Sequence, residues 1–162
     1  VDALTDALLF LRSTFELKGD ALLEGVTSSE SVLSNEQITQ NISDLHQIAD
    51  IDGNGEYDAL TDGLLLLRGM FGLDGSILVT GTIASNATYI TASDIELRID
   101  NLGDLADIDG NGEIDALTDG LLILRYLFEL EGEALTNGVV ADNATRSPAE
   151  IENHLKLLTP AI

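Results

Sequence analysis

Two segments of the chain carry side-chain oxygens at nearly every second position. Residues 50–62 read Asp-Ile-Asp-Gly-Asn-Gly-Glu-Tyr-Asp-Ala-Leu-Thr-Asp, and residues 107–119 differ only in having Ile114 where the first segment has Tyr57. Alternating oxygens meet at one centre only where the chain turns sharply. Gly55 and Gly112 favour such a turn, because a residue without Cβ tolerates positive φ. A centre of carboxylate and amide oxygens would bind a hard divalent cation.

The spacing of these oxygens matches a calcium loop. An EF-hand binds calcium through loop positions 1, 3, 5, 7 (by its backbone carbonyl), 9 and 12, with glycine at position 6. Each segment has Asp, Asp and Asn at positions 1, 3 and 5, Gly at 6, Glu at 7 and Asp at 9. The predicted metal ligands, with both glutamates acting through their carbonyls, are Asp50, Asp52, Asn54, Glu56, Asp58 and Asp62 in the first loop, and Asp107, Asp109, Asn111, Glu113, Asp115 and Asp119 in the second.

The closing position departs from the EF-hand pattern. Position 12 is Thr61 or Thr118, and the acid follows one residue later, at Asp62 or Asp119. We interpret each loop as one residue longer, with this acid as the closing ligand. The alternative is that the acid only favours the N-terminus of the helix that follows. Magnesium demands near-ideal octahedral geometry, so the many flexible oxygens favour Ca²⁺, at two full sites.

The loops belong to an internal repeat of about 57 residues. An Asp-Ala-Leu-Thr-Asp segment occurs three times, at 2–6, 58–62 and 115–119. The repeat predicts three units, with bounds 1–49, 50–106 and 107–162. The first unit lacks the N-terminal half of its loop, and Asp2 and Asp6 alone are not expected to hold calcium tightly.

Each unit is expected to contain two amphipathic helices. After the loop, Leu60, Leu64, Leu67 and Phe71 lie on one helix face, and a second apolar stripe lies beside it at 65–66, so we expect this face to be core. That helix should end near a glycine at 72 or 75. Capping residues mark the start of the next helix in each unit, at Ser34, Thr91 and Ser147.

The predicted fold class is therefore mainly α, with tandem helix–calcium loop–helix repeats. Three connectors stay undecided between a short strand and a packed loop: 18–33, 74–90 and 131–146.

Composition excludes several classes of protein. The net charge of −22 argues against binding to nucleic acid or to an anionic membrane surface, because a polyanion cannot neutralise phosphates. A hydrophobic content of 44% is too high for a disordered acidic tail. The absence of cysteine rules out disulfides and thiolate metal sites. No apolar run approaches the ~20 residues that a membrane helix needs, so we expect no membrane insertion.

The loop followed by Leu-Leu-Ile-Leu-Arg-Tyr-Leu at 121–127 resembles the loop–helix motif of type I dockerins, and most closely dockerin-like repeats of large secreted bacterial proteins. The resemblance covers 50–72 and 107–130, with a partial copy at 1–17. It implies calcium-dependent folding, an extracellular or cell-surface location and, in true dockerins, docking onto cohesin modules. The chain departs from dockerins in its widely separated loops, in the extra loop residue, and in having Ala-Leu where dockerins carry the hydroxyl pair that contacts cohesin.

These observations favour a calcium-binding structural or spacer module of a larger secreted or cell-surface bacterial protein. Its units would form a quasi-linear array rigidified by calcium, with calcium and neighbouring domains as partners. The alternative is a dockerin-like module that docks a cohesin-type protein. A calcium sensor is disfavoured, because sensor grooves are rich in Met and Met70 is the single Met of the chain. No enzyme is predicted, since every loop acid has a ligand position and no nucleophile–base set is present.

Overall fold

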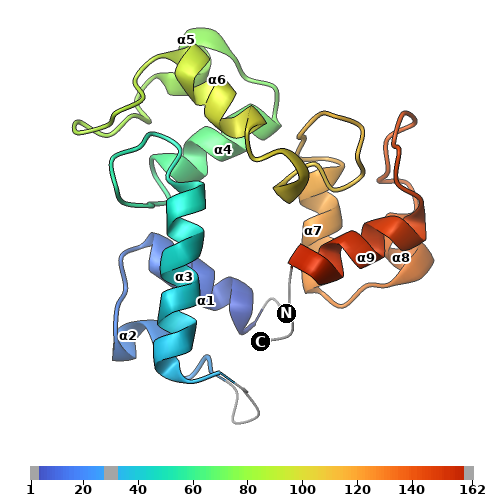
Figure 1. Ribbon diagram of the computed structural model, residues 1–162, viewed down its shortest axis with the longest axis horizontal. Helices are drawn as coiled ribbons and strands as arrows, with labels where there is room; N and C mark the ends of the chain where they lie inside the picture. Colours follow the sequence, from blue (N-terminus) through green and yellow to red (C-terminus); the bar gives the residue numbers. More distant parts are fainter. Residues whose placement is uncertain (1–3, 28–32, 159–162) are drawn as a thin grey trace.

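A computed structural model of the chain describes residues 4–27 and 33–158 (Figure 1). These residues form nine α-helices, one 3-10 helix and no β-strand, which confirms the prediction of a mainly helical fold. The elements are α1 (Asp6–Thr14), α2 (Asp20–Leu23), α3 (Asn35–Ala49), α4 (Asp62–Met70), α5 (Gly75–Val79), α6 (Ala92–Asp100), η1 (Gly103–Leu105), α7 (Asp119–Leu127), α8 (Gly132–Thr136) and α9 (Pro148–Leu158).

The helices enclose three separate hydrophobic clusters, each built by three successive α-helices. The first cluster, within α1–α3, consists of Leu9, Leu22, Val26, Ile38 and Ile42. The second, within α4–α6 and the loop before them, consists of Ile51, Leu65, Leu78, Ile95 and Ile99. The third, within α7–α9 and the loop before them, consists of Ile108, Leu122, Leu135, Val139, Ile151 and Leu155. Each three-helix group therefore buries its own hydrophobic residues.

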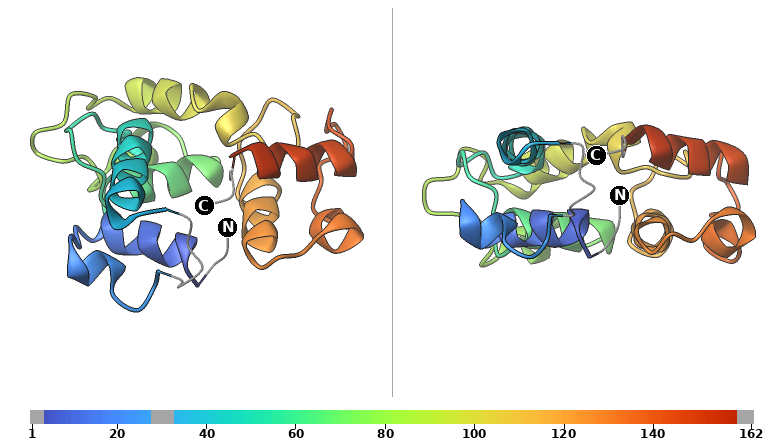
Figure 2. Two further views of the ribbon diagram at one scale, coloured as in Figure 1. Left: turned by 60° about the horizontal axis from the view of Figure 1, so that its bottom comes forward. Right: turned by 90° about the horizontal axis from the view of Figure 1, so that it is seen from below.

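The molecule has two layers of helices (Figure 2). One layer contains α3, α6 and α9, and the other contains α1, α4 and α7 together with α2 and α8. The hydrophobic clusters lie between the layers, because each draws residues from both. Figure 1 shows the three groups along a curve, whereas the sequence had suggested a quasi-linear array.

The first long helix in each group buries only part of the apolar arc that the sequence predicts as core. In α4, Leu65 is fully buried, whereas Leu60, Leu67 and Phe71 of the expected core stripe are exposed. The buried residues at the corresponding positions of α1 and α7 are Leu9 and Leu122. The helix therefore packs mainly through the second apolar stripe, while Leu64 of the first stripe is half-buried and the other three residues of that stripe are exposed.

Side-chain caps begin the last helix of each group, as predicted. At α3, Ser34 Oγ accepts a hydrogen bond from the Gln37 amide at 3.3 Å, and Gln37 Oε1 accepts one from the Ser34 amide at 2.9 Å. This is the expected capping box. At α6, Thr91 Oγ1 accepts a bond from the amide three residues on, and at α9 the Ser147 amide donates to Glu150. Local chemistry thus fixes where these helices start.

The described parts of the connectors each contain a short helix, α2, α5 or α8, and no strand. One recurring arginine holds each short helix in place. Arg68 Nη1 donates to three backbone carbonyls at the end of α5, each at 3.0 Å. Arg12 and Arg125 make the corresponding bonds to carbonyls of the α2 and α8 segments. Each arginine therefore satisfies carbonyls that a helix C-terminus leaves without intrahelical partners.

Successive groups are joined where a loop meets the preceding long helix. The Ala59 amide donates to the Thr14 carbonyl at the end of α1, at 3.1 Å, and the Ala116 amide donates to the Met70 carbonyl at the end of α4, at 2.9 Å. These bonds join corresponding positions of the repeat. Each loop therefore attaches at the same point of the group before it.

The first junction also contains an aromatic cluster. The ring of Tyr57 lies 5.4 Å from the rings of both Phe10 and His46, and His46 Nε2 lies 2.9 Å from Ser13 Oγ. Burial, with acidic side chains nearby, raises the pKa of the Tyr57 phenol to about 12. Tyr57 therefore serves this junction as a neutral packing residue.

Candidate metal centres

Glycines turn each loop back on itself. Gly53 and Gly55 have φ of +70° and +89°, and Gly110 and Gly112 have φ of +76° and +88°. This is the left-handed region that favours glycine. At Gly53 there is also no space for a side chain, because a Cβ would lie 2.6 Å from the ring of Tyr89.

The turn brings three carboxylates of the first loop together. One oxygen from each of Asp50, Asp52 and Asp62, the first Asp triad, lies within 4.8 Å of the others. Asp52 and Asp62 are completely buried, and Asp50 is half-buried. Loop amides hold these groups: Asp50 accepts from the amides of Asn54 and Gly55 at 3.1 and 3.0 Å, and Asp52 accepts from Asn54 at 3.1 Å.

The second loop repeats this arrangement. Asp107, Asp109 and Asp119, the second Asp triad, also place oxygens within 4.8 Å of one another. Asp109 and Asp119 are completely buried. Asp107 accepts from the amides of Asn111 and Gly112 at 3.1 and 2.9 Å, and Asp109 accepts from Asn111 at 3.0 Å. The same bonds in two loops indicate that the geometry follows from the loop sequence.

The acid that follows the loop threonine is the most extensively bonded member of its triad. Asp62 Oδ1 accepts from the amides of Ile51 and Asp52 at 2.7 and 3.1 Å, and Oδ2 accepts from the Asp58 amide at 3.2 Å and the Thr61 hydroxyl at 3.1 Å. Burial raises the pKa of Asp62, although these hydrogen bonds act to lower it. The pKa of Asp119 is raised in the same way. At both positions burial therefore acts against the charged form of the carboxylate, and the backbone amides act in its favour.

The acid at loop position 9 lies outside both triads. Asp58 Oδ1 accepts from the amides of Leu60 and Thr61, both at 2.9 Å, and Oδ2 accepts from the Thr61 hydroxyl at 2.5 Å. Asp115 accepts the same set of bonds in the second loop. In this geometry position 9 stabilises the turn into the next helix. In EF-hands the same position often reaches calcium through a water molecule.

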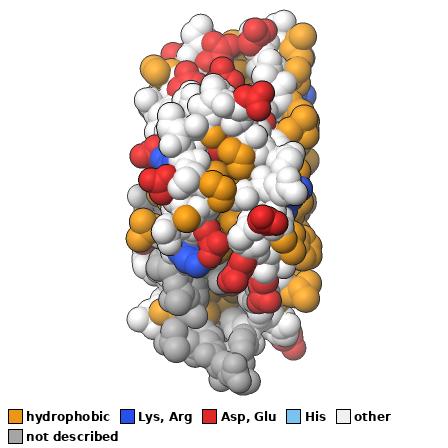
Figure 3. All heavy atoms as spheres, turned by 90° about the vertical axis from the view of Figure 1, so that its right-hand side faces the viewer, with side chains coloured by type: hydrophobic (Ala, Val, Ile, Leu, Met, Phe, Trp, Pro, Cys, Tyr) orange, Lys and Arg blue, Asp and Glu red, His pale blue; other side chains and the backbone are white. Residues whose placement is uncertain are grey.

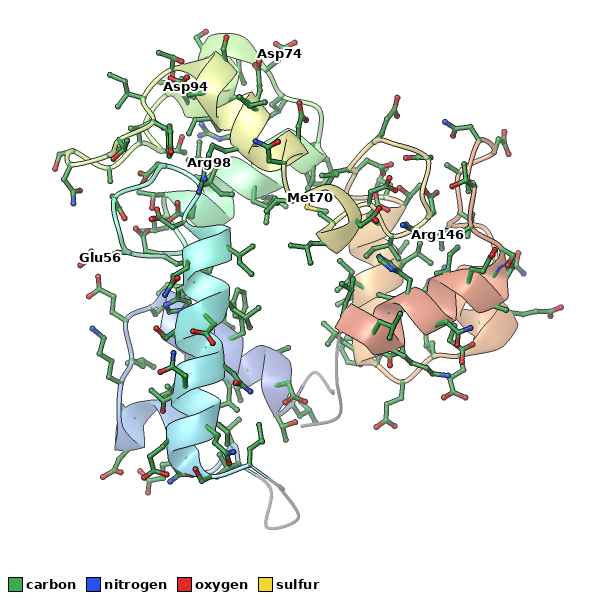
Figure 4. All side chains as sticks on the ribbon, in the orientation of Figure 1. Glu56, Met70, Asp74, Asp94, Arg98 and Arg146 are labelled. Atoms are coloured by element: carbon green, nitrogen blue, oxygen red, sulfur yellow. The ribbon has the colours of Figure 1, made fainter. Side chains whose placement is uncertain are left out.

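The remaining predicted ligands sit at the turn itself. Asn54 Oδ1 accepts from the Glu56 amide at 2.7 Å, and Asn111 Oδ1 accepts from the Glu113 amide at the same distance. The Glu56 side chain is exposed and lies on the outside of the loop (Figure 4). A contribution of Glu56 to a cation would therefore come from its backbone carbonyl, the atom named in the prediction.

A downstream segment covers each loop, which sequence reasoning did not anticipate. The Ala84 amide donates to Asp52 Oδ2 at 2.9 Å, and the amides of Thr88 and Tyr89 donate to the Asp52 carbonyl at 3.0 and 2.8 Å. In the second loop the Ala141 amide donates to Asp109 Oδ2, also at 2.9 Å. These contacts explain why the second aspartate of each triad is completely buried.

Two arginines approach the loops without neutralising the triads (Figure 4). Arg98 in α6 donates to the Asp50 carbonyl at 2.6 Å, and Arg146 before α9 donates to the Asp107 carbonyl at 2.5 Å. All seven Lys and Arg residues lie in the described part of the chain, and none pairs with a triad carboxylate. Sequence reasoning missed Arg98 and Arg146, because they do not occupy corresponding positions of the repeat.

Each triad can hold a metal ion. At 4.8 Å, two unit charges repel by about 3 kcal/mol at the effective dielectric constant of ~20 that suits protein sites. A divalent cation between the carboxylates replaces that repulsion by attraction. The donors are all oxygen, which suits calcium, magnesium or manganese and not metals that prefer thiolate or imidazole.

The first unit has no corresponding triad among the residues that the structure describes. Asp6 accepts a hydrogen bond from the Thr5 hydroxyl at 3.2 Å. Asp2 lies outside the described residues.

Comparisons with protein families, with curated proteins and with solved structures find no significant match to this chain. Within residues 4–27 and 33–158, no helix is both long enough and apolar enough to cross a lipid bilayer.

Proposed function

We propose that this chain is a calcium-binding structural module of a larger secreted or cell-surface bacterial protein, in which two calcium ions stabilise the fold. One observation carries the proposal: each loop gathers three aspartates, two of them completely buried, with no cationic side chain to neutralise them. Burial of carboxylates without a cationic partner is costly even where backbone amides donate to them, and a bound cation would offset that cost.

Calcium is the metal that the donor set favours. Calcium takes six to eight oxygens in flexible geometry, and each loop offers three carboxylates, an asparagine amide and a backbone carbonyl close together in sequence. Magnesium requires an octahedron near 2.0–2.1 Å and keeps several waters, which a loop of many oxygens matches less well. The proposed extracellular location is consistent with the choice of calcium, since extracellular calcium is abundant enough to fill sites of modest affinity.

A structural role is supported by what the loop touches. Ile51 is buried in the second cluster, Asp62 begins α4, and the Ala59 amide bonds to the end of α1. A cation held by the first triad would therefore stabilise both the second hydrophobic cluster and the junction between the loop and α1. At calcium concentrations about 100-fold above Kd, each site would add about 2.7 kcal/mol of stability.

The test is isothermal titration of the chelator-treated chain with calcium. Two sites are expected in the native chain, one in Asp62→Asn or Asp119→Asn, and none in the double variant. Titration with magnesium in parallel identifies the metal. An absence of calcium binding would refute the metal proposal, and equal affinity for magnesium would refute the choice of calcium.

Docking of a protein partner is a second candidate function. It is favoured by the large hydrophobic residues that the long helices α4 and α7 expose on the side away from their clusters.

A further inference from the structure

Met70 carries the single sulfur atom of the chain, because the sequence has one Met and no Cys. It is the last residue of α4, and its half-buried side chain lies between the second and third groups (Figure 4). The corresponding positions of the repeat are occupied by Thr14 and Leu127. The second junction is therefore the place where this chain can undergo sulfur chemistry.

The Met70 side chain reaches the first turn of α7. A Cβ at Gly120 would lie 3.2 Å from Met70 Cε, so the terminal methyl group packs where Gly120 has no side chain. The backbone of Met70 contacts the same unit, since its carbonyl accepts the bond from the Ala116 amide at 2.9 Å. One residue therefore makes both a side-chain contact and a backbone contact across the second junction.

The second junction differs from the first in what else stabilises it. Within the described residues, the helix pairs that pack most closely all belong to a single group, such as α4 with α6 and α7 with α8. The first junction adds the ring contacts of Tyr57 and Phe10, whereas the corresponding residues of the second are Ile114 and Leu66. The Met70 contacts are therefore a larger part of what holds the second junction.

Oxidation changes the chemistry of this contact. When hydrogen peroxide meets a thioether, a sulfur lone pair attacks one peroxide oxygen, an S–O bond forms, the O–O bond breaks and the second oxygen leaves as water. Sulfur loses two electrons and peroxide gains them. The sulfoxide is polar, and burial of its oxygen without a hydrogen-bond donor is costly. Hydration of the sulfoxide therefore competes with packing against Gly120.

Charge selects the class of oxidant. The chain has a net charge of −22, and acidic side chains far exceed basic ones on the face shown in Figure 3. An anionic oxidant is repelled by such a surface, whereas hydrogen peroxide is neutral and is not. A small neutral peroxide is therefore the oxidant that suits a half-buried sulfur on this molecule.

We propose that Met70 is a redox modification site, at which peroxide forms a sulfoxide that loosens the second junction while all three groups stay folded. This inference goes beyond the calcium-dependent structural role and does not depend on the metal. The third group gains freedom relative to the second. The change is reversible, because methionine sulfoxide is reduced by enzymes specific for each of its epimers.

The experiment treats the full chain in calcium with hydrogen peroxide and locates the added oxygen by peptide mass spectrometry. Amide hydrogen exchange then reports on each junction, since the Ala116 amide bonds across the second and the Ala59 amide across the first. We expect one sulfoxide, at Met70, and an about tenfold loss of Ala116 protection. Ala59 should keep its protection, as should the Leu65 and Leu122 amides inside α4 and α7.

Met70→Leu is the matched control, because leucine occupies the corresponding position 127 and cannot form a sulfoxide. In this variant Ala116 protection should stay at the native level with and without peroxide. Met70→Gln places a polar group of similar length at the junction and should lower Ala116 protection without any oxidant. Methionine sulfoxide reductases for both epimers, added with reductant to the oxidised native chain, should restore the protection.

Four results would overturn the proposal. One is the absence of a sulfoxide in the folded chain under conditions that oxidise the chain unfolded in urea. Another is a Met70 sulfoxide that leaves Ala116 protection unchanged. The third is an equal loss of protection in Met70→Leu after peroxide, since another side chain would then be responsible. The last is a parallel loss at Ala59 or Leu122, since oxidation would then unfold the chain instead of loosening one junction.

Discussion

Replacement of Asp62 by Asn separates the proposed metal-binding role of this residue from its structural role. Asn keeps the shape of the side chain and one acceptor oxygen, which can still accept from the amides of Ile51 and Asp52. The new NH₂ group then faces the Asp58 amide and the Thr61 hydroxyl. The hydroxyl can rotate to accept, so one amide donor loses its partner.

The structure predicts that Asp62→Asn changes the free energy of unfolding by different amounts without and with calcium. Without calcium, the unsatisfied donor costs about 1–3 kcal/mol, and the loss of a buried charge with a raised pKa offsets part of this cost. The net change should therefore be small. With calcium at about 100-fold above the native Kd, the variant also loses the ligand-derived stability, about 2.7 kcal/mol.

Amide hydrogen exchange measures this difference for each group separately. The Leu65 amide, bonded to the Thr61 carbonyl at 2.8 Å, reports on the second cluster, and the Leu122 amide, bonded to Thr118 at 2.8 Å, reports on the third. In calcium, Asp62→Asn should lower Leu65 protection about 100-fold more than it does in chelator. Leu122 protection should stay unchanged.

Asp74→Asn is the matched control, because it removes one charge at an exposed position that forms no side-chain cap. It should leave Leu65 protection unchanged in both conditions. If Asp62→Asn lowers Leu65 protection equally with and without calcium, Asp62 is a structural residue only and its proposed role in metal binding is refuted.

Three other changes test the scaffold. Arg68→Ala removes three bonds to carbonyls and should lower the unfolding free energy by about 2–3 kcal/mol, measured in urea. Gly53→Ala should cost at least about 2 kcal/mol in the same assay, because φ is positive and the Cβ would meet Tyr89. Burial, and secondarily Lys18, lowers the pKa of His46, so the unfolded chain binds more protons and stability should fall as the pH drops through about 6.5. His46→Gln should remove this pH dependence in urea unfolding from pH 5 to 8, and an unchanged slope would refute it.

Local rules predicted the parts of the structure that depend on a few neighbouring residues. The Ser34 capping box and the starts of α6 and α9 follow from hydrogen bonds within four residues. The two triads, too, form inside one turn that glycine allows. Of the predicted ligands, the acids at loop positions 1, 3 and 13 come together, while the acid at position 9 bonds to the start of the next helix.

The inward face of α4 could not be predicted from periodicity, because apolar residues occupy two adjoining stripes. Packing against α6 decides between them. A Cβ at Gly69 would lie 2.6 Å from Ile99 Cδ1, so close approach of the two helices requires a residue without a side chain there. Gly69 and Asp62, a predicted ligand, lie on the same side of the helix, and together they were a signal for the buried face.

Contacts between distant segments also could not be predicted from the sequence. The bond from the Ala84 amide to Asp52 joins residues 32 apart, and Arg98 reaches Asp50 across 48 residues. Repeat register did not reveal the arginines, since Arg98 lies within α6 whereas Arg146 precedes α9. Because Arg98 and Arg146 make the same kind of bond from different positions of the repeat, comparison of the repeat units does not reveal them.

The loop is part of the core as well as a candidate metal centre. Ile51 and Ile108, each next to the first aspartate of a triad, are completely buried in the second and third clusters. No residue of the described chain corresponds to them in the first cluster, and there every core residue retains some exposure, from 3% to 8%. The loop therefore closes the hydrophobic cluster beside it. Because the Asp62 carboxylate bonds directly to the Ile51 amide, a cation bound to Asp62 would also hold Ile51 in the core, and the proposed metal binding would in this way be linked to folding.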